Sequence, residues 1–125
     1  MKILVISKDQ NLIDHIKETD MFSSEIITVY NESNDPLDVM SFAIQSHPSL
    51  MIIDDDFLKP VSARIISSIK NVLTKVSTIF VTSDESYELG REISPLGIQY
   101  YAVKPVDVND MKDLIASLTK IKISE

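Results

Sequence analysis

Short apolar runs recur along the chain, separated by longer segments in which polar and apolar residues mix. The runs cover Lys2–Ser7, Glu25–Tyr30, Leu50–Asp54, Val76–Thr82 and Gln99–Val103. They are rich in isoleucine and valine and do not alternate strictly with polar residues, a pattern typical of parallel strands that are buried on both faces. The pattern therefore predicts five strands in one parallel sheet.

The segments between the runs carry apolar residues at helical spacing. They predict helices over Asp9–Thr19, from Asp35–Pro36 to just before His47–Pro48, from Pro60 to about Leu73, from Asp84 to about Ser94, and from Asp107 onward. Asp9, Asp35 and Asp107 suit the N-cap position of their helices, and Pro36 suits the first helical turn of the second helix. The apolar positions expected to face the core are Leu37, Met40 and Ile44 in the second helix and Val61, Ile65, Ile69 and Val72 in the third.

The alternation of strand and helix signals predicts an α/β fold. In such a fold a five-stranded parallel sheet is covered by helices on both faces, a doubly wound (βα)5 arrangement. The natural strand order for five such units is the flavodoxin-like order 2-1-3-4-5. The length of 125 residues suits a single domain, 1–125, and no internal repeat, linker or low-complexity stretch divides it.

The composition narrows the possible functions. The chain has no cysteine, which excludes disulfides and thiolate metal sites, and its two glycines are too few for a glycine-rich nucleotide loop. A net charge of −7 argues against nucleic acid binding. No apolar stretch approaches the roughly 20 residues of a membrane span, and the N-terminal run lacks the length and cleavage site of a signal peptide. A cytoplasmic protein is therefore expected.

Three polar side chains stand at the ends of three apolar runs. Asp54 ends the third run, Thr82 ends the fourth, and Lys104 follows the fifth and precedes Pro105. Because open α/β sheets place their sites at the carboxyl ends of the strands, we expect these side chains to lie together. A carboxylate nucleophile, a hydroxyl donor and an ammonium group at one point suit the handling of a phosphoryl group.

Three motifs give the chain a resemblance to a known family. They are His47–Asp54 (HPSLMIID), Gly97–Pro105 (GIQYYAVKP) and Thr82–Ser83, and each closes the expected strand. With these motifs in this order, the chain resembles the receiver domain of two-component response regulators over essentially its whole length. The resemblance implies the flavodoxin-like fold, a role as phosphoacceptor in signal transduction, and no enzymatic activity of its own.

The resemblance also implies roles for individual residues. Asp54 would be the phosphoacceptor, and Thr82 and Lys104 would contact the phosphoryl group. Tyr101 would be the aromatic switch residue, whose side-chain rotamer follows phosphorylation. Asp56 would offer its backbone carbonyl to Mg²⁺.

The partners of the chain are implied in the same way. A histidine kinase or a phosphotransfer protein would donate the phosphoryl group. A downstream protein, or a second copy of the chain, would bind the face formed by residues 84–94, residues 99–103 and the last helix. Neither nucleic acid nor a membrane is an expected partner of this domain.

The chain departs from the family at the end of the first strand. Receivers normally carry two adjacent acidic residues there that hold Mg²⁺, and Ser7 and Lys8 occupy those positions. Asp9 comes one residue late, so its side chain is not an automatic substitute. Mg²⁺ binding is therefore expected to be weakened, with Asp9, Asp54 and Asp56 as the candidate ligands. The ammonium group of Lys8 is a candidate to pair with Asp54 near the metal position.

The loop after the third strand departs from the family as well. The proline that receivers usually carry four residues after the acceptor is replaced here by Leu58. Consecutive side chains of an extended chain diverge, so at most two of Asp54, Asp55 and Asp56 are expected to reach a common point. The sequence predicts that Asp55 lies in a solvated acidic loop.

Alternatives to a working receiver stay open at this point. The Ser7–Lys8 pair favours a degenerate descendant, a pseudo-receiver that acts as a phosphorylation-independent interaction module. The order of Asp54–Asp56, Thr82 and a lysine also resembles phosphatases of the haloacid dehalogenase class, for which Asp107 and Asp110 are the remaining acidic candidates. A flavin protein of flavodoxin type would need a hydroxyl- and glycine-rich loop after the first strand, which the sequence there does not resemble.

Overall fold

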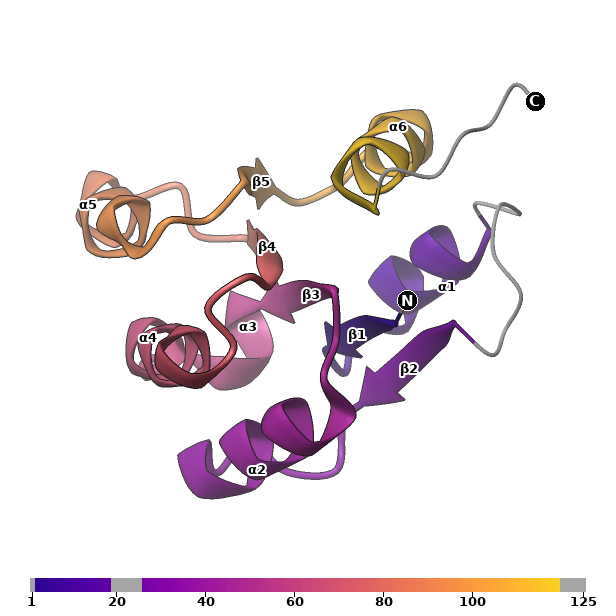
Figure 1. Cartoon of the computed structure of the whole chain (residues 1–125). Coiled ribbons are helices and arrows are strands. Elements are labelled where there is room, and N and C mark those ends of the chain that lie inside the picture. The colour runs from indigo at the N-terminus through magenta and orange to yellow at the C-terminus, as the bar shows by residue number, and fades with distance from the viewer. Residues whose placement is uncertain (1, 19–25, 120–125) are drawn as a thin grey trace.

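In the computed structural model, which describes residues 2–18 and 26–119, five strands form one parallel sheet (Figure 1). The strands are β1 (Ile3–Ile6), β2 (Ile27–Tyr30), β3 (Leu50–Asp54), β4 (Ser77–Thr82) and β5 (Tyr100–Val103). Their order is β2-β1-β3-β4-β5, and every neighbouring pair runs parallel. The predicted fold class and strand order are therefore confirmed.

The helices are α1 (Gln10–Lys17), α2 (Pro36–Ser46), α3 (Asp55–Leu58), α4 (Ser62–Val72), α5 (Tyr87–Ile93) and α6 (Val108–Thr119), with a 3₁₀ turn, η1, at Ser94–Leu96. The sequence pattern does not predict α3, because its four residues are too few to show a helical period. Parts of the predicted elements at Thr19, Glu25 and Ile121 lie outside the described residues. None of the described helices is long and apolar enough to cross a membrane.

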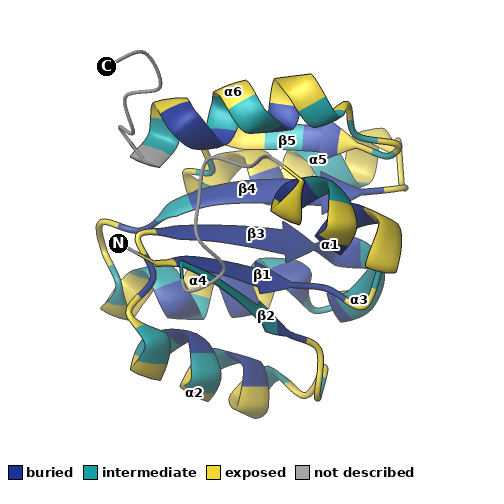
Figure 2. Cartoon of the chain, turned by 90° about the vertical axis from the view of Figure 1, so that its right-hand side faces the viewer, coloured by how far each residue is buried: buried dark blue, intermediate teal, exposed yellow. Residues whose placement is uncertain are grey.

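Alternate side chains of the strands enter two separate cores. Ile3 and Val5 of β1 pack with the buried faces of α1 and α6, whereas Leu4 and Ile6 pack with those of α2, α4 and α5. Figure 1 shows α1 and α6 on one side of the sheet and α2 to α5 on the other. The central strands are buried almost throughout, and exposure rises toward the edge strands β2 and β5 (Figure 2). Burial on both faces explains why the strands read as continuous apolar runs.

The three aspartates predicted to cap helices all lie at helix starts. Asp9 is the N-cap of α1 and Asp35 that of α2, and Asp107 Oδ1 accepts the N–H of Asp110 at 2.9 Å where α6 begins. The N-cap of α1 also fixes the position of the Asp9 carboxylate. Oδ1 of Asp9 accepts two backbone N–H groups of the first turn of α1, which holds the carboxylate at the carboxyl end of β1.

The predicted inward face of α4 is confirmed at Ile65 and Ile69, but one end residue of each predicted face, in α2 and in α4, is exposed. Leu37 of α2 is 72% exposed and Val72 of α4 is 58% exposed, whereas Val39 and Ala43 of α2 are fully buried. α2 packs against α4 as well as against the sheet, and Val39 and Ala43 belong to the core on that side of the sheet. The buried line of α4 runs through Ser62, Ile65, Ile66 and Ile69. Val72 therefore lies at the margin of that line, at the last residue of the helix.

Candidate functional site

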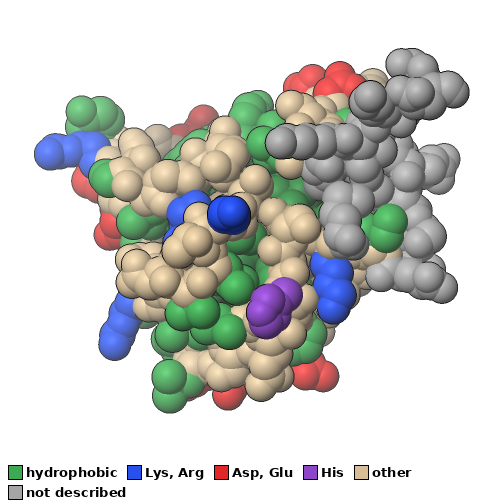
Figure 3. Space-filling view, in the orientation of Figure 1, with side chains coloured by type: hydrophobic (Ala, Val, Ile, Leu, Met, Phe, Trp, Pro, Cys, Tyr) green, Lys and Arg blue, Asp and Glu red, His purple; other side chains and the backbone are tan. Residues whose placement is uncertain are grey.

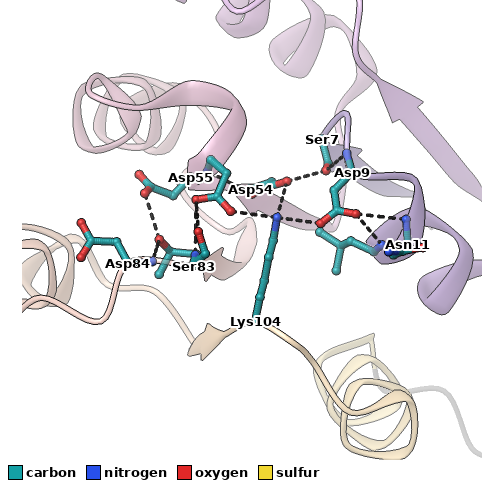
Figure 4. A network of polar contacts seen from close by, with 11 residues as sticks. Ser7, Asp9, Asn11, Asp54, Asp55, Ser83, Asp84 and Lys104 are labelled. Atoms are coloured by element: carbon teal, nitrogen blue, oxygen red, sulfur yellow. Dashed lines mark hydrogen bonds and ion pairs between the residues drawn. The ribbon is translucent and has the colours of Figure 1, made fainter.

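The carboxyl ends of the strands bring together polar side chains from separate parts of the chain (Figure 4). Asp54, the last residue of β3, has a side chain that is only 2% exposed. Its Oδ2 accepts hydrogen bonds from Ser7 Oγ at 2.6 Å and from Lys104 Nζ at 3.0 Å. Its Oδ1 accepts the N–H of Asp56 at 3.0 Å, which makes Asp54 the N-cap of α3. The structure thus brings Asp54 and Lys104 together, as the ends of their strands indicated.

The ammonium group of Lys104 is shared by three carboxylates. Its Nζ lies 2.8 Å from Asp9 Oδ2, 3.0 Å from Asp54 Oδ2 and 3.0 Å from Asp56 Oδ2. The peptide bond between Lys104 and the exposed Pro105 is cis. We call the lysine and its three carboxylate partners the outer cluster. All four residues line an open hollow of about 510 Å³.

The charges of the outer cluster reinforce one another. Burial alone would lower the pKa of Lys104, but its three carboxylate partners raise that pKa above the ordinary value of 10.5. The hydrogen bond from Lys104 lowers the pKa of Asp9. Burial would raise the pKa of Asp56, but hydrogen bonds from Ser83 and Lys104 outweigh burial and lower it. At neutral pH this ammonium group and these two carboxylates are therefore charged.

In the segment after β1, Ser7 contacts Asp54 and Asp9 contacts Lys104, whereas Lys8 lies over the ring of Phe57. The buried hydroxyl of Ser7 accepts the N–H of Asp9 at 2.9 Å and donates to Asp54. This turn brings the carboxylate of Asp9 back to the outer cluster although Asp9 comes one residue late. Lys8 lines the same hollow, but it is exposed and its Nζ lies 5.6 Å from the centroid of the Phe57 ring. The ion-pair partner of Asp54 is therefore the lysine after β5 and not Lys8, the candidate from the sequence.

A second group of polar side chains lies in the interior beside the first. Asp55 is 2% exposed, and it accepts hydrogen bonds from Ser62 Oγ at 2.7 Å and from Thr82 Oγ1 at 3.0 Å. Ser62 and Thr82 are also buried, and we call these three residues the inner cluster. The expectation of a solvated Asp55 is wrong because α3 begins directly after β3, so Asp55 turns inward to the first residue of α4. The hydroxyl residues at the start of α4 and the end of β4 are the sequence signal that could have indicated a buried acceptor.

Of the two residues expected to respond to phosphorylation, Thr82 belongs to the inner cluster and Tyr101 packs against β4, the strand that ends at Thr82. Thr82 Oγ1 donates to Asp55 and accepts the N–H of Asp84 at 2.9 Å. The ring of Tyr101 packs on Phe80 with the ring centroids 5.2 Å apart, and its buried hydroxyl has no hydrogen-bond partner among the described residues. Burial first, and then the charges of Asp55 and Asp84, raise the pKa of Tyr101. In this structure the hydroxyl of Thr82 therefore donates its hydrogen bond to Asp55.

No family model and no curated protein matches the sequence, but solved structures match the fold. A putative pilus assembly protein from Burkholderia thailandensis matches at 15% identity over 96% of this chain and 98% of its own, with a TM-score of 0.76. The receiver domain of a putative LuxO repressor from Vibrio parahaemolyticus matches at 19% identity over 95% and 89%, with a TM-score of 0.74. HP1043, an orphan response regulator of H. pylori, matches at 19% identity over 94% and 95%, with a TM-score of 0.75. The chain has the fold of a response-regulator receiver domain.

The outer cluster of this receiver fold does not fit a magnesium ion as it stands. Its three carboxylates supply the hard oxygen donors that Mg²⁺ prefers, but they converge on the ammonium group of Lys104. Mg²⁺ needs oxygen ligands at roughly 2.1 Å in near-octahedral geometry. Within residues 2–18 and 26–119, no group of three or more acidic, histidine or cysteine side chains is arranged to hold a metal ion.

A groove of about 740 Å³ lies on the receiver fold between α5 and β5. Tyr87 and Arg91 of α5 and Tyr100 and Tyr101 of β5 are among its lining residues. Tyr87 is 75% exposed and Tyr100 is 44% exposed, so aromatic rings face solvent on both sides of the groove. The groove lies on the face for which the sequence predicts a protein partner.

Proposed function

We propose that this chain is a receiver-type signalling domain in which Asp54 accepts a phosphoryl group and a protein-interaction face responds. The proposal rests on the environment of Asp54, a carboxylate at an open hollow that is bonded to Lys104 Nζ at 3.0 Å and to Ser7 Oγ at 2.6 Å. The hollow gives a phosphoryl donor access from solvent. The ammonium group supplies the positive charge that a transferring phosphoryl group requires.

The reaction would take the phosphoryl group from a phosphohistidine of a histidine kinase or phosphotransfer protein. A carboxylate oxygen of Asp54 forms a bond to phosphorus while the bond from phosphorus to the imidazole nitrogen of the donor breaks. The electron pair of that bond stays on the imidazole, which takes up a proton. Lys104 lies beside the new phosphoryl oxygens because it already contacts Asp54 Oδ2, and Ser7 Oγ is a second donor at the same oxygen.

Binding of Mg²⁺ is weak in this proposal. Ser7 and Lys8 stand where receivers carry their acidic pair, so two carboxylates are missing from the site. Lys104 occupies the point at which the remaining carboxylates converge. A side chain, in place of an ion, then neutralises the negative charge around Asp54.

The response would appear at the groove between α5 and β5. Tyr101 lines the groove and packs against Phe80 of β4, the strand that ends at Thr82. A movement of Thr82 toward a phosphoryl group would therefore change the packing of Tyr101 and the shape of this face. The partner there would be a downstream protein or a second copy of the chain.

Nucleic acid is not part of this proposal. The sequence carries a net charge of −7, and a nucleic acid site needs a basic surface. Lys and Arg side chains are scattered singly over the described part of the face in Figure 3. The observation does not favour contact with a phosphate backbone on that face.

A pseudo-receiver is the second candidate function. Two observations favour it: Lys104 already has three carboxylate partners, and the Thr82 hydroxyl donates to Asp55. In that function the same face would bind its partner without phosphorylation. A phosphatase of the haloacid dehalogenase class is not proposed, because Asp107 is exposed and is engaged in capping the start of α6.

Intact mass spectrometry after incubation with acetyl phosphate separates the two candidates. The protein is incubated with and without Mg²⁺, beside an Asp54→Asn variant. A gain of one phosphoryl group in the wild type and none in Asp54→Asn supports the receiver, and an equal gain without Mg²⁺ indicates that a side chain replaces the ion. No gain, under conditions that modify an ordinary receiver in parallel, would overturn the phosphoacceptor role and leave the pseudo-receiver.

A further inference from the structure

The inner cluster holds a buried carboxylate that the proposed phosphotransfer does not use. Asp55 is 2% exposed and follows the candidate phosphoacceptor directly in the sequence. Both of its oxygens have a donor, since Ser62 donates to Oδ1 at 2.7 Å and Thr82 donates to Oδ2 at 3.0 Å. A buried carboxylate is costly unless hydrogen bonds compensate for lost water, so these two bonds hold Asp55 in the interior.

The hydroxyl of Thr82 has a single proton to donate. The hydroxyl oxygen accepts a hydrogen bond from the N–H of Asp84 at 2.9 Å, and the hydroxyl donates its one hydrogen bond to Asp55 Oδ2 at 3.0 Å. A hydrogen bond from Thr82 to a phosphoryl oxygen on Asp54 needs that same proton. The two bonds therefore exclude each other, and the bond to Asp55 has to break before the other can form.

We propose that Asp55 is a positioning residue that holds Thr82 in the resting state and competes with a phosphoryl group on Asp54 for its hydroxyl proton. This inference deepens the proposed function and rests on it. The bond between Thr82 and Asp55 is buried, so breaking it leaves the carboxyl group of Asp55 in the interior with one donor fewer. A weaker acceptor at position 55 should let the site bind a phosphoryl group more tightly, but only when Thr82 is present.

Ser62 provides a matched control for Asp55. It is buried and bonded to the other oxygen of the same carboxylate, so Ser62→Ala disturbs the inner cluster without removing the acceptor of Thr82. If Asp55 were merely structural, Asp55→Asn and Ser62→Ala would both weaken phosphoryl binding. Tighter binding in Asp55→Asn alone is expected only if Asp55 holds Thr82 back.

The first test is a calorimetric titration with beryllofluoride, an analogue of a phosphoryl group on a carboxylate, in the presence of Mg²⁺. We expect Asp55→Asn to tighten binding about 10-fold and Ser62→Ala to change it by less than about two-fold. The effect of Asp55→Asn should vanish in a Thr82→Val background. Binding by Asp55→Asn that is no tighter than wild type, or the same tightening in Thr82→Val, would overturn the proposal.

A measurement on the resting protein separates failure of this inference from failure of the proposed function. Three-bond NMR couplings to the Thr82 methyl group report its side-chain rotamer. We expect one rotamer in the wild type and in Ser62→Ala, and averaging between rotamers in Asp55→Asn. Averaging without beryllofluoride binding by any variant would support the hold on Thr82 and count against the phosphoacceptor. A fixed Thr82 in Asp55→Asn would overturn the inference itself.

Discussion

Three consecutive aspartates of this chain belong to two clusters with opposite surroundings. Asp54 and Asp56 lie at the open hollow and share one ammonium group, whereas Asp55, between them, lies in the interior on two hydroxyl groups. Successive side chains leave an extended chain in opposite directions, and α3 begins at once after the strand. Identical neighbours in the sequence can therefore have different chemistry because the backbone delivers them to different sides.

The two clusters also depend on different forces. The outer cluster is a network of ion pairs in which the side chains of Lys104 and Asp9 are 17% and 31% exposed. Dissolved ions screen such partly exposed charges. The inner cluster joins a carboxyl group to two hydroxyl donors, and all three side chains are buried, where screening by salt is much weaker. Salt and Mg²⁺ should therefore act on the outer cluster and leave the inner cluster unchanged.

The largest effect is expected from Lys104→Met. The variant leaves the three carboxylates of the outer cluster without their cation, and we expect the free energy of unfolding to fall by about 3 kcal/mol. Millimolar Mg²⁺ should restore part of this loss, because the carboxylates then surround an open cation position. Urea denaturation with and without Mg²⁺ measures both effects. Equal stabilisation of wild type and variant by Mg²⁺ would contradict the view that Lys104 occupies that position.

Asp55→Ala tests the other side of the comparison. The free energy of unfolding should fall by about 2 kcal/mol, because two buried hydroxyl groups lose their acceptor. This loss should be the same at low and high salt, whereas the loss in Lys104→Met should shrink as salt is added. Urea denaturation of both variants across a salt series provides the measurement. A salt-dependent loss in Asp55→Ala would remove the distinction between the two clusters.

A smaller effect is expected from pH, and it concerns the outer cluster. The pKa values of Asp9 and Asp56 in the folded protein lie below the ordinary 3.8, so their contribution to stability is complete above that value and is lost as pH falls through the lowered pKa values. The pKa of Lys104 lies above 10.5, so its contribution is present below 10.5 and is lost at higher pH.

The Asp9→Asn variant checks this pH dependence. Its free energy of unfolding should fall less steeply than that of the wild type as the solution is made acidic, because one of the responsible carboxylates is gone. Urea denaturation at a series of acidic pH values compares the two slopes. If the free energy of unfolding fell equally steeply with acid in both proteins, Lys104 would not stabilise the charged form of Asp9.

The smallest effect, and one of opposite sign, is expected from Tyr101→Phe. The hydroxyl of Tyr101 is buried and has no hydrogen-bond partner in the part of the chain that the structure describes. Its removal should raise the free energy of unfolding by about 1 kcal/mol. Tyr100→Phe, at a side chain that is 44% exposed, is the matched control and should change little. A loss of stability in Tyr101→Phe would indicate that the hydroxyl has a partner.

The fold and the meeting of Asp54 with Lys104 could be predicted from the sequence. Strands that are buried on both faces appear in the sequence as continuous apolar runs, and the carboxyl ends of parallel strands lie at the same edge of the sheet. The directions of single side chains could not be predicted. Whether Lys8 or Asp9 contacts the cluster depends on the direction of the chain after Ser7, and the hydrogen bond from Ser7 to Asp54 forms only once β1 and β3 lie side by side.

The helix faces show the same limit in another form. The spacing of large apolar residues pointed to Leu37 of α2, but the fully buried residues of that helix are Val39 and Ala43. The burial of Asp55 could not be predicted from the sequence for a related reason. Its burial depends on α3, a helix too short to leave a period in the sequence, and on donors that come from α4 and β4.

The position of β5 has a consequence for how quickly the site can open. β5 is an edge strand of the described sheet and pairs with β4. Lys104 follows β5 directly, so a local detachment of this strand withdraws the ammonium group from all three carboxylates in one event. Slow amide hydrogen exchange in β5 would mark a pocket whose negative charges stay covered. Fast exchange would mark a pocket in which β5 detaches, and the three carboxylates lose Lys104, many times within the lifetime of a single folded molecule.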